Sequence, residues 1–125
     1  MRLLLDTHTL LWWLNGGRNL SRKSLELIRD PENDVFVSSA SAWEIALKKA
    51  IGKLVAPDNL EEEILRHQFE RLPILFSHVS ELLALPPIHR DPFDRMLVAQ
   101  SKAEDLTLVT RDENIRKYGI DTIPA

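Results

Sequence analysis

Four acidic residues stand where apolar, strand-like runs of this chain give way to a loop or to the start of a helix. They are Asp6, Glu44, Asp94 and Asp112. Carboxylates gathered in one pocket repel one another and lose hydration, so they usually require a bound cation. Oxygen ligands of this kind suit Mg²⁺ or Mn²⁺, which activate water and stabilise an in-line displacement at phosphorus. The four residues therefore predict a metal-dependent site.

Asp6 and Glu44 each have a simpler structural explanation. Asp6 could cap the helix that follows it, but it ends the wholly apolar run 3–5, where an unpaired charge would be costly. This position favours a functional role. Glu44 stands three residues after Ser41, in the S-x-x-E spacing of a capping box. For Glu44 alone, the cap and the functional site are equally good interpretations.

The other two acids are also ambiguous when taken singly. Asp91, followed by proline, is expected to cap a helix, with Asp94 as a favourable charge in its first turn. Asp112 lies between Thr110 and Glu113, which again have the spacing of a capping box. Caps alone would produce part of this pattern, but they would not require Asp6. The metal site is therefore the better explanation of the four together.

Other chemistry-bearing residues show weaker patterns. The four histidines, His8, His67, His78 and His89, lack zinc-site spacing and are expected to cap, pack or face solvent. Basic residues at 18–23 and 48–53 could contact phosphates or form an ordinary solvated face. Gly16-Gly17 matches neither the dinucleotide nor the P-loop glycine pattern.

Composition limits the remaining possibilities. The chain has 125 residues, 44% hydrophobic and 28% charged, which predicts one soluble globular domain over residues 1–125. A formal net charge of −3 argues against binding nucleic acid by bulk charge alone, without excluding a nuclease. The absence of cysteine excludes disulfides, thiolate zinc sites and a cysteine nucleophile. No run approaches the ~20 apolar residues of a membrane span, so we expect a cytoplasmic protein without membrane contact.

The apolar pattern alternates between strand and helix. Strands are predicted at residues 3–5, 35–37 and 106–109, with weaker candidates at 72–76, which contains Pro73, and at 120–123. Helices are predicted from Thr7 or Thr9 to Trp13 or Leu14, from Ser21 to before Pro31, from residues 38–41 to Gly52, after Pro57-Asp58, over 79–83, from Asp91 through Gln100, and over 110–116. This order predicts an α/β fold with a parallel sheet covered on both faces, and a site beyond the carboxyl ends of its strands.

With these motifs in place, the sequence resembles PIN-domain ribonucleases, in particular the VapC-type toxins of toxin–antitoxin pairs. The resemblance spans nearly the whole chain. It is carried by residues 3–8 (LLLDTH), 38–45 (SSASAWEI), 89–100 (HRDPFDRMLVAQ) and 108–112 (LVTRD). Each motif alone is loose, but the ordered set is specific.

The resemblance implies a three-layer α/β/α sandwich around a mostly parallel sheet, and Mg²⁺- or Mn²⁺-dependent endonucleolytic cleavage of RNA. It implies that Asp6 and Asp94 are the principal metal ligands and that Asp112 completes the metal site. Glu44 would bind the metal through water or orient the attacking water, and the hydroxyl of Thr110 would position the pocket. It further implies a homodimer and a small antitoxin partner.

Three alternatives stay open beside a toxin. A phosphatase or phosphoacceptor domain would share the sheet, but the chain has His8 where the phosphatase pattern needs a second Asp. It has Thr110-Arg111 where a receiver needs Lys. A housekeeping RNA-processing PIN nuclease would share every motif. A non-catalytic interaction module would use the four acids only as caps.

Overall fold

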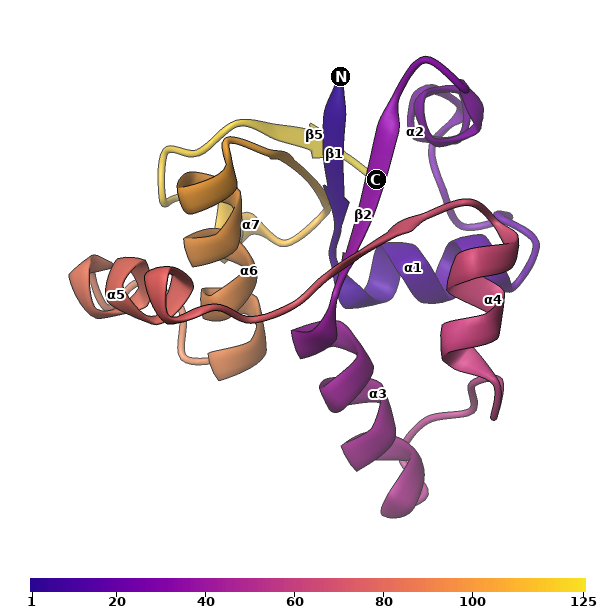
Figure 1. Ribbon diagram of the computed structural model, residues 1–125, viewed down its shortest axis with the longest axis horizontal. Coiled ribbons are helices and arrows are strands. Elements are labelled where there is room, and N and C mark those ends of the chain that lie inside the picture. Colours follow the sequence, from indigo (N-terminus) through magenta and orange to yellow (C-terminus); the bar gives the residue numbers. More distant parts are fainter.

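The computed structural model describes all 125 residues and contains five strands and seven helices (Figure 1). The strands are β1 (Arg2–Leu5), β2 (Asp34–Ser38), β3 (Glu70–Leu72), β4 (Thr107–Thr110) and β5 (Thr122–Pro124). The helices are α1 (Thr7–Leu14), α2 (Arg22–Arg29), α3 (Ser39–Ala50), α4 (Leu60–Arg66), α5 (Phe76–Ala84), α6 (Pro92–Glu104) and α7 (Glu113–Arg116).

All five strands are parallel and lie in the order β3-β2-β1-β4-β5. The central strand β1 is wholly apolar after Arg2, and Leu3, Leu4 and Leu5 have no exposed surface. Leu4 lies opposite Phe36 of β2 on one side and Leu108 of β4 on the other. A strand this apolar is stable only where helices cover both faces of the sheet.

Alternate residues of the strands enter two separate apolar layers. Leu3 and Leu5 pack with Val35, Val37 and Val109 in one cluster, whereas Leu4 and Leu108 belong to the other. Helices α1, α2 and α4 cover the first face, and α5, α6 and α7 cover the second (Figure 1). The predicted three-layer α/β/α sandwich with a mostly parallel sheet is therefore confirmed.

Two predicted helix starts are confirmed by their caps. Ser21 caps α2 by accepting the backbone N–H of Ser24 at 3.1 Å. Asp91 caps α6 by accepting from Phe93 at 2.8 Å, with Pro92 in the first turn, where its missing N–H costs nothing.

Neither of the two capping boxes that the spacing allowed as an alternative explanation is formed. Helix α3 is capped by Ser38, which accepts from the N–H of Ala40 at 3.0 Å, so Ser41 already lies inside the helix. Helix α7 is capped by Asp112 itself and not by Thr110. Ser41 has helical backbone and cannot be the cap, whereas Thr110 still belongs to strand β4, two residues before the helix cap.

The predicted strand at 72–76 is also corrected. Strand β3 covers Glu70–Leu72, and Phe76 already begins helix α5. Pro73 has no N–H to donate to the strand ladder, so the pairing with β2 ends at Leu72.

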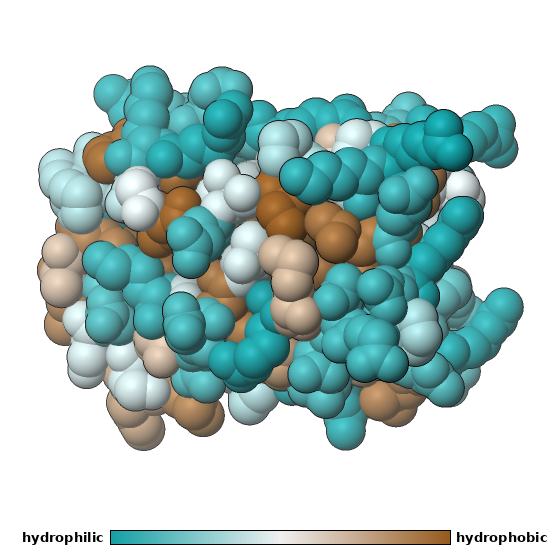
Figure 2. Space-filling view, turned by 90° about the horizontal axis from the view of Figure 1, so that it is seen from above, coloured by the Kyte–Doolittle hydropathy of each residue, from teal (hydrophilic) through white to brown (hydrophobic).

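None of the helices has both the length and the apolar character that crossing a bilayer demands. Seen from the end at which β1 and β2 begin, the surface is mostly hydrophilic with separate hydrophobic patches (Figure 2). The acidic residues considered next follow the opposite ends of the strands.

Candidate metal centre

The acidic residues lie at the point where the order of the strands reverses. From β1 the chain builds outward through β2 to β3, and it then returns to place β4 on the other side of β1. Asp6 directly follows β1, and Asp112 follows β4 by two residues. The crevice beyond the carboxyl ends of two such strands is the usual ligand site of parallel α/β sheets.

Asp6 is buried, with 5% of its surface exposed, and each of its oxygens accepts a hydrogen bond. One oxygen caps α1 by accepting the N–H of Thr9 at 2.8 Å, and the other accepts the hydroxyl of Thr110 at 2.6 Å. Asp6 is thus both a cap and a member of the cluster. These bonds hold the carboxylate rigidly between β1 and β4, and each oxygen retains a lone pair for a further partner.

Asp94 lies in the first turn of α6, where the capping is done by its neighbour. Asp91 accepts the N–H groups of Phe93 and Asp94 at 2.8 and 3.1 Å, so the Asp94 side chain is not needed as a cap. Burial raises the pKa of Asp94 to about 7, and the negative charges of Asp91, Asp6 and Glu44 add to the shift while His89 opposes it. The carboxylates of Asp6 and Glu44 therefore lie near enough to Asp94 to repel it.

Asp112 faces the same crevice from the start of α7. One of its oxygens accepts the N–H groups of Asn114 and Ile115 at 2.8 and 3.2 Å, and the other lies 3.1 Å from the ring nitrogen Nε2 of His89. Burial alone would raise the pKa of Asp112, but the hydrogen bonds from His89, Ile115 and Asn114 outweigh it and lower that pKa. Asp112 thus stays ionised beside the hard-to-ionise Asp94.

Glu44 reaches the cluster from α3 and is only 3% exposed. Its Oε2 pairs with Lys48 Nζ at 2.5 Å, and the bond to Glu44 raises the pKa of this lysine. Its other oxygen, Oε1, is buried and has no partner. A buried carboxylate oxygen without a partner is costly unless something else, such as water or a cation, binds it.

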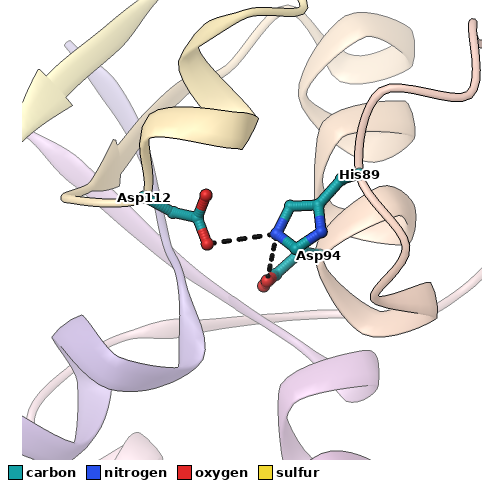
Figure 3. Close-up of side chains that lie close together, drawn as sticks. All are labelled: His89, Asp94 and Asp112. Carbon is teal, nitrogen blue, oxygen red and sulfur yellow. Dashed lines mark hydrogen bonds and ion pairs between the residues drawn. The ribbon is translucent and has the colours of Figure 1, made fainter.

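His89 is the residue of this site that sequence reasoning missed. Its Nε2 lies 3.1 Å from Asp94 Oδ2 and 3.1 Å from Asp112 Oδ2, so that it bridges the two carboxylates (Figure 3). The three side chains offer ligand atoms within 4.8 Å of one another. Zinc-type spacing could not find this residue, because its role depends on a contact with Asp112, 23 residues away along the chain.

The residues present fit a hard divalent cation. Two of the four predicted acids, Asp94 and Asp112, are bridged by His89 at the switch point, and Asp6 and Glu44 lie within electrostatic reach of Asp94. Burial, together with the negative charges of Asp91, Asp6 and Glu44, raises the pKa of Asp94. The carboxylate oxygens of these acids, among them the unpartnered Oε1 of Glu44, are the kind of ligand that Mg²⁺ or Mn²⁺ prefers.

Comparison with protein families gives one match that covers most of this chain. Residues 3–121 match the sequence profile of the PIN domain. The chain belongs to the PIN-domain family. Among curated protein sequences, none matches this PIN domain at a significant level.

Solved structures share the same fold. VapBC2 from Rickettsia felis, bound to a DNA fragment from its promoter, superposes with a TM-score of 0.76 at 17% identity, covering 98% of both chains. FitAcB from Neisseria gonorrhoeae gives 0.65 at 19% identity, covering 98% of this chain and 96% of that one. A toxin–antitoxin complex from Klebsiella pneumoniae gives 0.58 at 21% identity, covering 88% and 86%.

These identities are low, so the likeness itself concerns the fold. The match to the PIN-domain profile confirms the resemblance to PIN domains found in the sequence.

Proposed function

We propose that residues 1–125 form a single PIN nuclease domain that cleaves RNA endonucleolytically with Mg²⁺ or Mn²⁺, as the toxin of a toxin–antitoxin pair. The observation that carries this proposal is the gathering of Asp6, Glu44, Asp94 and Asp112 at the switch point of the sheet. Helix caps do not need to converge on one point of the sheet, whereas the charges of Asp6 and Glu44, from two other elements, both act on Asp94. Family membership supports nuclease chemistry over the phosphatase and receiver alternatives.

In this proposal Asp6, Asp94 and Asp112 hold the cation, which when bound supplies Lewis acidity and a bound water that ionises easily. Thr110 and the N–H of Thr9 hold Asp6 in place by the two hydrogen bonds described above. The free Oε1 of Glu44 is suited to accept a hydrogen bond from water and orient it. The protein needs no covalent nucleophile for this chemistry.

An exposed aromatic side chain beside the acids supports an RNA substrate. Trp43 precedes Glu44, is 59% exposed and meets the ring of Phe93 edge to face at 5.0 Å. Phe93 in turn precedes Asp94. Aromatic rings next to a cleavage site offer a stacking surface for unpaired bases, which compensates for the absence of a basic overall charge.

An apolar groove supports an antitoxin partner. A groove of about 1060 Å³ lies beside the carboxyl ends of β2 and β3 and is lined by Ile45 of α3 and by Leu60 and Ile64 of α4. Ion pairs of 2.6 Å (Lys49–Asp58) and 2.8 Å (Arg71–Glu61) involve residues of its lining. A groove of this kind suits the apolar face of an amphipathic segment from a small protein.

A separate apolar stripe supports the proposed homodimer. Phe76, Val79 and Leu83 recur at helical spacing on α5 and are 94%, 38% and 83% exposed. Contiguous exposed apolar side chains on a helix usually mark an interface. Light scattering on wild type and on Leu83→Lys tests this part separately, because the stripe does not belong to the acidic site.

The proposed activity is tested by calorimetric titration with Mn²⁺ and by RNA cleavage. We expect Asp6→Ala and Asp94→Ala to bind Mn²⁺ far more weakly and to cut RNA about 1000-fold more slowly, because metal catalysis supplies several kcal/mol. Asp121→Asn, an exposed acid away from the site, is the matched control. Wild type that binds no Mn²⁺ and cuts no RNA would reject the proposed metal-dependent activity.

A further inference from the structure

His89 is held by contacts at both ring nitrogens and at its backbone N–H. Its side chain is 13% exposed, its Nε2 lies 3.1 Å from both Asp94 and Asp112, and its Nδ1 lies 3.1 Å from the backbone nitrogen of Asp91. Its own backbone N–H donates to the hydroxyl of Tyr118 at 2.8 Å. Such a network leaves the ring little freedom to rotate.

The contact with Asp91 decides which ring nitrogen carries the proton. A backbone N–H can only donate, so Nδ1 must accept, and an accepting Nδ1 has no proton. The proton of the neutral ring therefore lies on Nε2, facing Asp94 and Asp112. The backbone of the cap residue thus makes His89 a donor toward the two carboxylates.

This arrangement is the reverse of a metal-binding histidine. A ligating imidazole presents a bare nitrogen to the metal and usually donates its other N–H to a carboxylate or a carbonyl. Here the nitrogen that faces the acids is the protonated one, and the other nitrogen receives an N–H. Proximity alone would make His89, Asp94 and Asp112 a ligand triad, but the hydrogen bonding excludes His89 from it.

We propose that His89 is a positioning residue whose Nε2–H donates to Asp112 while lying 3.1 Å from Asp94, and which thereby sets the separation and orientation of the two carboxylates for a divalent cation without binding that cation itself. The inference rests on the proposed metal-dependent function and deepens it. A donor between two carboxylates offsets their repulsion, which would otherwise turn the side chains apart.

The segment that carries His89 is anchored in a way that suits this role. Arg95 of α6 donates to the Tyr118 hydroxyl at 3.1 Å and to the carbonyl of Pro86 at 3.0 Å. Tyr118 thereby links the backbone of His89 to the helix that bears Asp94. His89 and one of the two carboxylates beside its ring, Asp94, therefore belong to one connected unit.

Two substitutions separate positioning from packing. His89→Gln keeps a side-chain N–H near the position of Nε2, whereas His89→Leu keeps the bulk and removes the donor. We expect calorimetry to give His89→Gln a Mn²⁺ affinity within about threefold of wild type and His89→Leu an affinity about 10- to 100-fold weaker. Equal losses in the two variants, or no loss in either, would overturn the proposal.

Two spectroscopic measurements address the ring directly. In ¹⁵N-histidine NMR of the metal-free protein, we expect His89 to show a protonated Nε2 and a bare Nδ1; the opposite tautomer would overturn the proposal. In electron spin-echo spectra of the Mn²⁺-loaded wild type, we expect no directly bonded ring nitrogen, and finding one would overturn it as well. Absence of Mn²⁺ binding by wild type would instead reject the proposed function, and the metal-free NMR result would still decide the role of His89.

Discussion

Two buried or half-buried histidines of this protein, His78 and His89, differ in the number of carboxylates beside their rings. His78 of α5 is fully buried, lies 2.9 Å from Glu104 of α6 and accepts the N–H of Leu75 at 3.0 Å. One imidazole there faces one carboxylate. His89 faces Asp94 and Asp112 together, and the charges of Asp6 and Glu44 add to the same site.

The difference separates a structural contact from a functional one. The His78–Glu104 pair satisfies itself and joins two packed helices, so it needs no further ligand. Around His89 there are more carboxylates than donors: burial and the neighbouring negative charges raise the pKa of Asp94 to about 7, and an oxygen of Glu44 has no partner. An excess of acceptor oxygens over donors in a half-buried crevice favours the binding of a cation.

The strongest way to test this contrast is to remove the structural histidine. His78→Ala should lower the free energy of unfolding by about 3 kcal/mol, because it opens a cavity and leaves the N–H of Leu75 without its acceptor. Urea denaturation measures the loss. Mn²⁺ affinity should stay at the wild-type value, and a parallel loss of metal binding would show that the two histidines do not differ in role.

Added Mn²⁺ should stabilise the folded protein only by binding at the acidic site. At a free Mn²⁺ concentration 100 times its Kd, wild type should gain about 2.7 kcal/mol of unfolding free energy. Thermal melts with and without Mn²⁺ show this gain, and Asp6→Asn should lose most of it. A gain that persists in Asp6→Asn would place the cation elsewhere on the protein.

Without metal, the free energy of unfolding should be lower at high pH, where the buried Asp94 is ionised beside the other carboxylates. The pKa of Asp94 is raised from 3.8 to about 7, so between these values the folded state keeps a proton that the unfolded state has released. Stability from this residue is therefore greatest below pH 4 and falls as the pH rises toward 7.

Asp94→Asn removes that titration. At pH 8 and without metal, the variant should be more stable than wild type by about 1–2 kcal/mol, since water at the half-buried site screens part of the repulsion. Melting curves from pH 4 to pH 8 in a chelator measure the difference. If wild type and Asp94→Asn follow parallel curves, the carboxylates do not repel one another as described.

The smallest expected effect concerns Lys48, which competes with a cation for Glu44. Lys48→Met should raise Mn²⁺ affinity by about threefold, the size expected for a partly exposed ion pair. Lys49→Met, whose partner Asp58 is fully exposed, serves as the matched control and should leave the affinity unchanged. A decrease in affinity for Lys48→Met would mean that Glu44 depends on the lysine for its orientation.

Local patterns predicted most of the elements of this fold. Strand β1 follows from the leucines at 3–5, and α6 follows from Asp91-Pro92, because burial on two faces and proline at a helix start are readable within a few residues. The errors fall where two local signals compete. Ser38 and Ser41 are both plausible caps, and residues 72–76 are apolar enough for a strand although Pro73 ends the pairing.

The candidate site was predictable in part. The four acids could be selected because each stands at, or within two helical turns of, the end of a strand or the start of a helix, and their roles as ligands stay a prediction. His89 could not be selected, because its importance depends on a distance to Asp112, 23 residues away, and on the N–H of Asp91 against its ring.

The sequence by itself determined the order of strands and helices and which carboxylates could converge, since apolar periodicity and caps are properties of short segments. Only the tertiary structure decided that β4 lies beside β1, that Asp94 is crowded enough to hold a proton near pH 7, and which nitrogen of His89 faces the acids. These depend on charges and hydrogen bonds between segments up to about a hundred residues apart, and such interactions exist only once the chain is folded.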